Sequence, residues 1–221
     1  LNRCGVEPGN SALELARQIV SVRGLSFAGL MAYEGCLLHK NYEDLVDETR
    51  QVMKPVLETR DILKTAGIEV RTISVGGTHN YEVAGEIEGI TEIQAGSYVV
   101  LDNSYRDFRP ELTPSLNVLA TIVSNPEPTI VVADAGHKAV GADQHLPQVE
   151  GVPGTTVVRC SAEHSKIELS GLGIGAVDLG DKVWLSPYDA ETCMNLYNFI
   201  NVIRDGKLEA IWEISARGMY N

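Results

Sequence analysis

The spacing of apolar residues changes character along this chain, and that change constrains the fold more than any single motif. Up to residue 111, strand-like runs alternate with helical patterns, which is typical of parallel strands joined by helical crossovers. From residue 112 onward, short runs rich in Val, Ile and Thr are separated by Gly, Pro and Asp. We therefore expect an α/β domain over residues 1–111 and an antiparallel β domain over residues 112–221.

Two helices are expected in the first domain. Ser11-Ala12-Leu13-Glu14 has the form of a capping box, and the helix that it opens should stop at Gly24. Asn41 can cap a second helix that runs to Gly67. Pro55 lies within this second pattern, so we expect it to kink the helix or divide it in two.

Two further segments carry clear local signals. Residues 25–31 form an apolar run that is typical of a buried strand. Near the C-terminus, Asp205-Gly206 lies between two apolar runs and suits a tight turn with positive backbone angles, which predicts a hairpin over residues 197–214.

A glycine-rich stretch, Ser74-Val75-Gly76-Gly77-Thr78, follows a strand-like run over residues 68–73. Consecutive glycines let the backbone approach an anion closely, several N–H groups can converge on it, and the threonine hydroxyl adds a donor. The same residues are also compatible with an ordinary turn. The stretch, called the glycine loop below, is a candidate phosphate site.

Composition excludes some partners. The net charge of −12 argues against nucleic acid, because binding phosphate backbones requires clustered Lys and Arg. The sequence contains no apolar run of membrane-spanning length and no signal-peptide pattern, so we expect no membrane partner and a cytoplasmic location. The four cysteines are scattered without a Cys-x-x-Cys pair, so most are expected to be reduced and partly buried.

Several short blocks occur in a fixed order along the chain. They are Asn2–Gly9, Ala32–Gly35, the glycine loop, Thr91–Tyr98, Val132–Lys138, Ser161–His164, Gly180–Val183 and Asn195–Tyr197. In this order they resemble the D-threonine aldolase and D-serine dehydratase family of pyridoxal-phosphate enzymes of fold type III. The resemblance implies the C-terminal half of an alanine-racemase-type (β/α)8 barrel, which binds the cofactor, followed by a β-rich domain of the D-serine dehydratase type.

The resemblance also implies that the chain is truncated at its N-terminus. Family members carry their Schiff-base lysine near the end of the first barrel strand, in a block that this chain lacks. We therefore expect that lysine on a missing N-terminal segment, and this chain alone to be inactive. The lysines weighed for the role, none of which lies in a matching motif, are Lys40, Lys54, Lys64, Lys138, Lys166, Lys182 and Lys207.

Contacts to pyridoxal 5'-phosphate follow from the matched blocks. The resemblance implies that Gly76, Gly77 and Thr78 hold the phosphate, and that Arg3 approaches the polar edge of the pyridoxal ring. Without the resemblance, the glycines are equally compatible with a turn and the arginine with a surface ion pair.

Three further side chains are candidates at the same site. Tyr98 is expected to place a hydroxyl near the phosphate, and Tyr33 to contact the cofactor or the substrate. Gln94 is a candidate supporting amide. Packing inside the fold is the alternative for both tyrosines.

A metal site is expected where the family carries Pro-x-His-x-Cys or Pro-x-His-x-Asp before Asn-Leu. Here Asp189 takes the histidine position and Glu191 the Cys or Asp position, which suits Mg²⁺ or Mn²⁺ better than Zn²⁺. A solvated acidic loop is the alternative. His164 is a candidate nitrogen ligand or general acid, and a surface histidine is the alternative there.

The resemblance implies a lyase acting on D-3-hydroxy amino acids. The first expectation is aldolase chemistry that yields glycine and an aldehyde. A D-serine dehydratase-like ammonia-lyase and a non-catalytic binder of pyridoxal phosphate are the alternatives. The expected partner is a small D-amino acid, and a homodimer is compatible with the resemblance.

Overall fold

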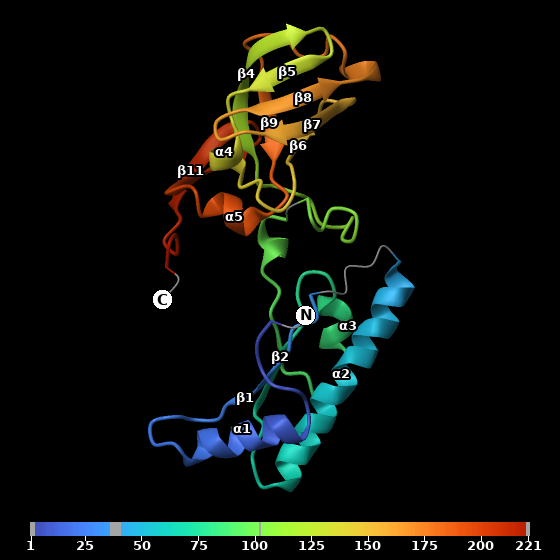
Figure 1. The fold of residues 1–221 in the computed structure, drawn as a ribbon, viewed down its shortest axis with the longest axis vertical. Helices are drawn as coiled ribbons and strands as arrows, with labels where there is room; N and C mark the ends of the chain where they lie inside the picture. The colour runs from blue at the N-terminus through green and yellow to red at the C-terminus, as the bar shows by residue number, and fades with distance from the viewer. Residues whose placement is uncertain (1–2, 36–40, 102, 220–221) are drawn as a thin grey trace. The chain divides into compact units, whose positions relative to one another are not determined.

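A computed structural model describes residues 3–35, 41–101 and 103–219 (Figure 1). The chain forms two compact units, residues 1–98 and residues 99–221. The segment after residue 98 belongs to the second unit because the backbone N–H groups of Asn103 and Ser104 donate to the carbonyls of Pro187 and Tyr188, each at 3.2 Å. The domain division expected after residue 111 therefore falls inside this second unit.

The first unit is built on a parallel sheet in the order β1-β2-β3. Met53 of the longest helix packs with Ile73, Val75 and Ala84 in the core of this unit, so one apolar helix face covers the sheet. The elements are α1 (Asn10–Ser21), β1 (Gly29–Met31), α2 (Tyr42–Thr65), β2 (Thr72–Val75), α3 (Tyr81–Gly85), β3 (Glu92–Ile93) and the 3-10 turn η1 (Ser97–Val99).

The helix predictions were partly right. Asn41 caps α2 through its side chain, which accepts from the N–H of Glu43 at 2.9 Å, and this confirms the predicted cap. The capping box at residues 11–14 is wrong, because α1 already begins at Asn10 and its N-cap residue is Gly9. α2 is not divided at Pro55, since it runs unbroken to Thr65. Its buried apolar face holds the helix together across the missing hydrogen bond.

The strand expected over residues 25–31 is much shorter and more exposed than predicted. Only Gly29–Met31 pair with a neighbour, and the Leu25 and Met31 side chains are 58% and 67% exposed. Apolar composition alone predicted burial here, but burial depends on what packs against the strand.

The second unit is an antiparallel β domain, as predicted. Six strands pair in the order β6-β9-β4-β5-β8-β7, and the two end strands also contact each other, so the sheet is nearly closed. Its core contains Ile122, Val131, Ile167 and Leu185. The strands are β4 (Val118–Glu127), β5 (Ile130–Ala133), β6 (Gln148–Glu150), β7 (Thr155–Cys160), β8 (Ser165–Leu169) and β9 (Lys182–Ser186), with α4 (His137–Val140) and η2 (Gly171–Gly173) between them and α5 (Ala190–Met194) after β9.

A separate hairpin, β10 (Phe199–Arg204) and β11 (Lys207–Glu213), ends this unit. Its turn is Asp205-Gly206, and both residues have positive φ, 50° and 72°, as a tight turn of this kind requires. The predicted hairpin is therefore confirmed.

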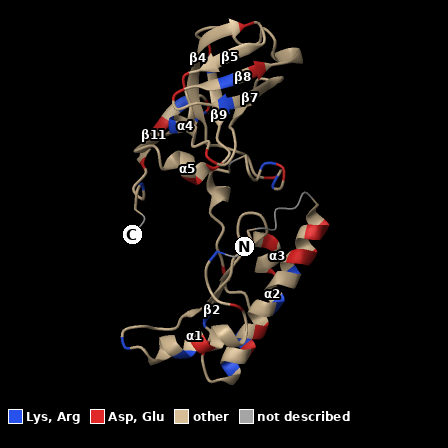
Figure 2. Ribbon diagram, viewed as in Figure 1, with Lys and Arg blue, Asp and Glu red and all other residues tan. Residues whose placement is uncertain are grey.

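Basic and acidic residues occur in both units. Figure 2 shows Lys and Arg scattered over both units, while Glu43 and Asp44 lie in the first turn of α2, where they complement the positive end of the helix. In the part of the chain that the structure describes, no helix is both long and apolar enough to cross a membrane.

A glycine in β1 provides a test of this fold. A Cβ on Gly29 would lie 1.8 Å from the carbonyl oxygen of Thr72, so Gly29→Ala should force β1 and β2 apart. We expect a loss of about 3 kcal/mol in the free energy of unfolding, measured by chemical denaturation followed by circular dichroism. Gly85→Ala is the matched control, because a Cβ there meets nothing within 4 Å and alanine favours the helix. Equal stability of the two variants would contradict the close approach.

Candidate functional site

The ends of the parallel strands bring the candidate residues of the first unit together. β1, β2 and β3 run in the same direction, so the segments that follow them leave from one edge of the sheet. The N–H of Ala32 donates to the carbonyl of Ser74 at 3.0 Å, and the N–H of Gln94 donates to the carbonyl of Val75 at 2.9 Å. The residues after each strand thus start side by side.

The glycine loop is buried and tightly shaped. Gly76 has a φ of 77°, which favours glycine over other residues. A Cβ on Gly77 would lie 3.0 Å from Nδ1 of His79, so no side chain fits there without displacing the imidazole. Thr78 is 2% exposed. Glycine is therefore favoured at position 76 by the backbone conformation, and at position 77 by the closeness of His79.

Hydrogen bonds determine which loop groups are available to a ligand. The N–H of Gly77 donates to Oδ1 of Asn80 at 3.1 Å, and the hydroxyl oxygen of Thr78 accepts from the N–H of Tyr98 at 3.1 Å. Within the described residues, no hydrogen bond involves the N–H of Gly76 or of Thr78. Those two N–H groups, together with the hydroxyl proton of Thr78, can therefore donate to an anion.

Tyr33 lies beside the glycine loop, and Arg3 lies over Tyr33. The guanidinium of Arg3 lies over the ring of Tyr33, with Cζ 5.3 Å from the ring centroid. The tyrosine ring meets His79 edge to face, with 6.3 Å between centroids, and lies 3.6 Å from the position that a Cβ on Gly77 would take. The structure thus gathers Arg3, Tyr33 and the glycine loop, which are far apart in sequence.

Sequence reasoning missed a group of buried polar residues behind the loop. Asn80 is fully buried, and its Nδ2 donates to Oε1 of Glu34 at 2.6 Å and to Oγ1 of Thr49 at 3.3 Å. Glu34 and Thr49 are 6% and 0% exposed. The available signal was a run of polar residues directly after a buried strand, since His79 and Asn80 follow Thr78 and are buried as well.

Gln94 and Tyr98 occupy the third strand end. Nε2 of Gln94 donates to Oγ of Ser74 at 2.7 Å, and Oγ of Ser74 donates in turn to the Glu92 carboxylate. Gln94 therefore supports β2 just before the glycine loop. Tyr98 is 51% exposed and touches the loop through its backbone N–H.

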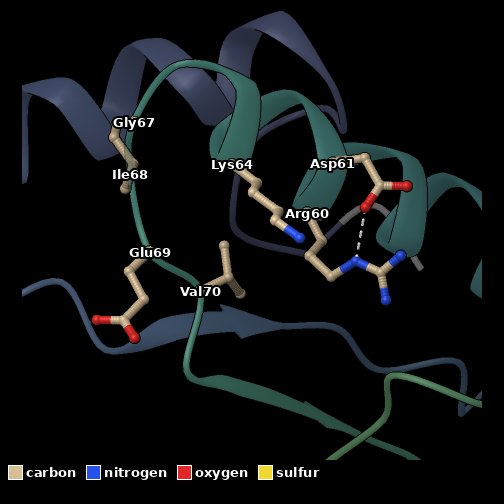
Figure 3. Close-up of a pocket in the computed structure, with 7 residues that line it drawn as sticks. All are labelled: Arg60, Asp61, Lys64, Gly67, Ile68, Glu69 and Val70. Atoms are coloured by element: carbon tan, nitrogen blue, oxygen red, sulfur yellow. Dashed lines mark hydrogen bonds and ion pairs between the residues drawn. The ribbon is translucent and has the colours of Figure 1, made fainter.

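A hollow of 590 Å³ lies elsewhere on this unit, before the start of β2 (Figure 3). Nε of Arg60 donates there to Oδ1 of Asp61 at 2.8 Å, which raises the pKa of Arg60 and lowers the pKa of Asp61. The two side chains are 31% and 62% exposed, so this is a surface ion pair of little energetic weight. The hollow is lined by Arg60, Asp61, Lys64, Gly67, Ile68, Glu69 and Val70.

In the second unit, His164 lies in the exposed turn between β7 and β8, beside a hollow of 360 Å³. The neighbouring Glu163 accepts a hydrogen bond from Nζ of Lys138 at 2.6 Å, which lowers the pKa of the carboxyl and raises the pKa of the ammonium. Lys138 is thus held at the surface by a carboxylate.

Asp189 serves as the N-cap of α5. Its Oδ1 accepts from the N–H of Thr192 at 3.0 Å, and its Oδ2 accepts from Nε2 of Gln144 at 2.8 Å. Cys193, in the same helix, is buried, and burial followed by the charge of Asp189 raises the pKa of its thiol to about 12. Glu191 lies in the first turn of α5.

The described residues contain no group of three or more His, Cys, Asp or Glu side chains placed to hold a metal ion. Both carboxylate oxygens of Asp189 already accept hydrogen bonds. Metal binding at Asp189 and Glu191 therefore stays a prediction.

Comparisons with known proteins agree with the fold and identify the family that this chain is similar to. Residues 115–203 match the family model described as "Putative serine dehydratase domain". D-threonine aldolase of Arthrobacter sp is 38% identical over 98% of this chain and 58% of its own length. The 3-hydroxy-D-aspartate aldolase of Paracoccus denitrificans (strain Pd 1222) is 30% identical over the same shares. The chain thus spans 58% of the length of these relatives.

Solved structures show the same fold. The crystal structure of D-threonine aldolase from Filomicrobium marinum is 29% identical, with a TM-score of 0.92 over 100% of this chain and 62% of that chain. Alanine racemase of Clostridium difficile 630 is 14% identical, with a TM-score of 0.61 over 96% of this chain and 63% of that chain, and shows the fold alone. The predicted fold class, part of an alanine-racemase-type barrel followed by an antiparallel β domain, is confirmed.

The cap at Asp189 can be separated from a metal role by two substitutions. Asp189→Ala removes the acceptor for Thr192 and should lower the free energy of unfolding by about 1 kcal/mol, while Asp189→Asn keeps an acceptor and should lose less than half of that. Thermal and chemical unfolding measure both variants, with and without added Mg²⁺, Mn²⁺ or Zn²⁺. Stabilisation of the natural chain by one of these ions, absent from both variants, would show that the carboxylate binds metal.

Proposed function

The chain belongs to the D-threonine aldolase and D-serine dehydratase-like family, and from this premise we propose that the protein is a pyridoxal-phosphate-dependent lyase. Its substrates are D-3-hydroxy amino acids, which it cleaves to glycine and an aldehyde. The observation that carries this proposal is the convergence of Arg3, Tyr33 and the glycine loop at one edge of the parallel sheet.

The glycine loop fits the phosphate of the cofactor. Two N–H groups, of Gly76 and Thr78, have no hydrogen-bond partner within the described residues, and the Thr78 hydroxyl keeps a proton to donate. Glycine at position 76 allows the positive φ of the loop, and glycine at position 77 avoids a close contact with His79, so both suit a loop whose N–H groups converge on an oxyanion. The N–H of Gly77 is already bonded to Asn80, so it is not a donor to the phosphate. Gly77 serves the loop because it has no side chain.

The other residues bind and orient the cofactor ring. Arg3 is positively charged and stacked on Tyr33, so it can hold an anionic phenolic oxygen while the tyrosine restricts its movement. Tyr98 follows the third strand and bonds to Thr78 through its backbone N–H, and its hydroxyl is a proposed further donor to the phosphate. When bound, pyridoxal phosphate accepts the electron pair that remains on Cα after a bond to that carbon breaks.

The roles of His164, Asp189 and Glu191 remain proposals. His164 is proposed as a general acid on an exposed turn of the second unit. Asp189 and Glu191 are proposed ligands of a divalent ion, although the described residues place no third His, Cys, Asp or Glu with them. The cytoplasmic location and the homodimer also stay predictions.

A dehydratase is the second candidate. The family model over residues 115–203 is described as a serine dehydratase domain, and D-threo-3-hydroxyaspartate dehydratase of Delftia sp. (strain HT23) is 26% identical over 65% of this chain. Loss of water from the same substrates, followed by hydrolysis that takes up water and releases ammonia, needs a different bond to break at Cα. The products distinguish the two reactions, since an aldolase releases glycine and an aldehyde while a dehydratase releases a 2-oxo acid and ammonia.

Binding of the cofactor tests the proposal directly on this chain. Isothermal titration with pyridoxal 5'-phosphate and with pyridoxal, which lacks the phosphate, should give at least about tenfold tighter binding of the phosphorylated form. Gly77→Ala should remove most of that difference, because the added Cβ pushes on His79, while Gly85→Ala should leave it unchanged. Equal affinities of the natural chain for the two compounds would overturn the proposed phosphate site. Product analysis with D-threonine and D-serine on the protein from its natural source then separates aldolase from dehydratase.

A further inference from the structure

The amide of Asn80 has a fixed orientation, because its nitrogen and oxygen face different partners. Nδ2 donates to the Glu34 carboxylate at 2.6 Å and to the Thr49 hydroxyl at 3.3 Å, while Oδ1 accepts from the N–H of Gly77 at 3.1 Å. Rotating the amide would place its N–H groups against the N–H of Gly77 and its oxygen against a carboxylate. The contacts therefore admit one orientation only.

These partners come from three separate elements. Glu34 follows β1, Thr49 lies in α2, and Asn80 follows the glycine loop after β2. All three are at least nine-tenths buried, so water competes little for their hydrogen bonds. Asn80 also donates its own N–H to the carbonyl of Gly77 at 3.3 Å, so it closes the loop through both its side chain and its backbone.

Closing the loop selects the groups that face a ligand. Because the N–H of Gly77 is directed to Asn80, the loop is held in the conformation in which the N–H groups of Gly76 and Thr78 lack partners within the described residues. If Asn80 released Gly77, that N–H would be free to rotate, and the loop would have to be ordered when the anion binds. Ordering on binding lowers affinity.

We propose that Asn80 is a positioning residue for the phosphate cradle, and that Glu34 acts through it by fixing the orientation of its amide. The inference rests on the proposed function, because it assigns a residue to the phosphate site proposed above. Neither Asn80 nor Glu34 is proposed to contact the phosphate itself. Their effect is on the preference for phosphorylated over unphosphorylated cofactor, which depends on the shape of the loop.

Moving the carboxylate from position 34 to position 80, and the amide from position 80 to position 34, tests the proposed roles of Glu34 and Asn80. In Asn80→Asp the acceptor for Gly77 remains, but the new carboxylate opposes Glu34, so the preference for pyridoxal 5'-phosphate over pyridoxal should fall by about tenfold or more. In the double variant Glu34→Gln with Asn80→Asp, the glutamine amide can donate to the aspartate, and the total charge is that of the natural chain. The double variant should recover the preference to within about threefold of the natural chain.

Two controls separate this from a loss of folding. Circular dichroism and chemical denaturation report whether each variant is folded, and binding of pyridoxal reports whether the rest of the site is intact. Thr49→Val removes only the longer of the two hydrogen bonds to Nδ2 and should change the preference by less than about threefold.

The outcomes distinguish the inference from the proposed function. If the natural chain shows no preference for the phosphorylated compound, the proposed phosphate site fails. If the natural chain shows the preference and folded Asn80→Asp keeps it in full, Asn80 is not a positioning residue. Failure of the double variant to recover the preference, while it remains folded, would overturn the role of Glu34.

Discussion

The close approach of β1 and β2 determines what the first unit can bind. Gly29 allows this approach, because a Cβ at this position would collide with the backbone of Thr72. Parallel pairing at this register puts the ends of the two strands next to each other. The segment carrying Tyr33 and Glu34 then starts beside the glycine loop, and the contacts of Tyr33 with His79 and of Glu34 with Asn80 follow from that placement.

Burial of polar groups is the second constraint on this edge of the sheet. Thr49, Thr78, His79 and Asn80 are each no more than 2% exposed, and burying such groups costs free energy unless they are hydrogen-bonded. Asn80 meets this requirement for itself with five hydrogen bonds, three through its side chain and two through its backbone, and its side chain also bonds the buried Thr49. A buried and hydrogen-bonded group of this kind holds the glycine loop in one conformation.

Part of this architecture was accessible from sequence because local chemistry determined it. Asn41 caps α2 and Asp205-Gly206 turns the hairpin through interactions within a few residues. The convergence of Glu34 with Asn80 depends on strand register across 46 residues, which no local pattern encodes. The short, exposed β1 was mispredicted for a related reason, since apolar composition does not reveal what covers a strand.

Asp189 has a local structural role, the capping of a helix, that the family motif does not indicate. The resemblance places a histidine there, and the expectation of a metal ligand followed from that alignment. In this chain Asp189 is the N-cap of α5. Its carboxylate accepts a hydrogen bond from the N–H of Thr192 and complements the positive end of the helix. Histidine is a poorer N-cap than aspartate. Helix capping is therefore a sufficient physical reason for aspartate at this position, independent of any ion.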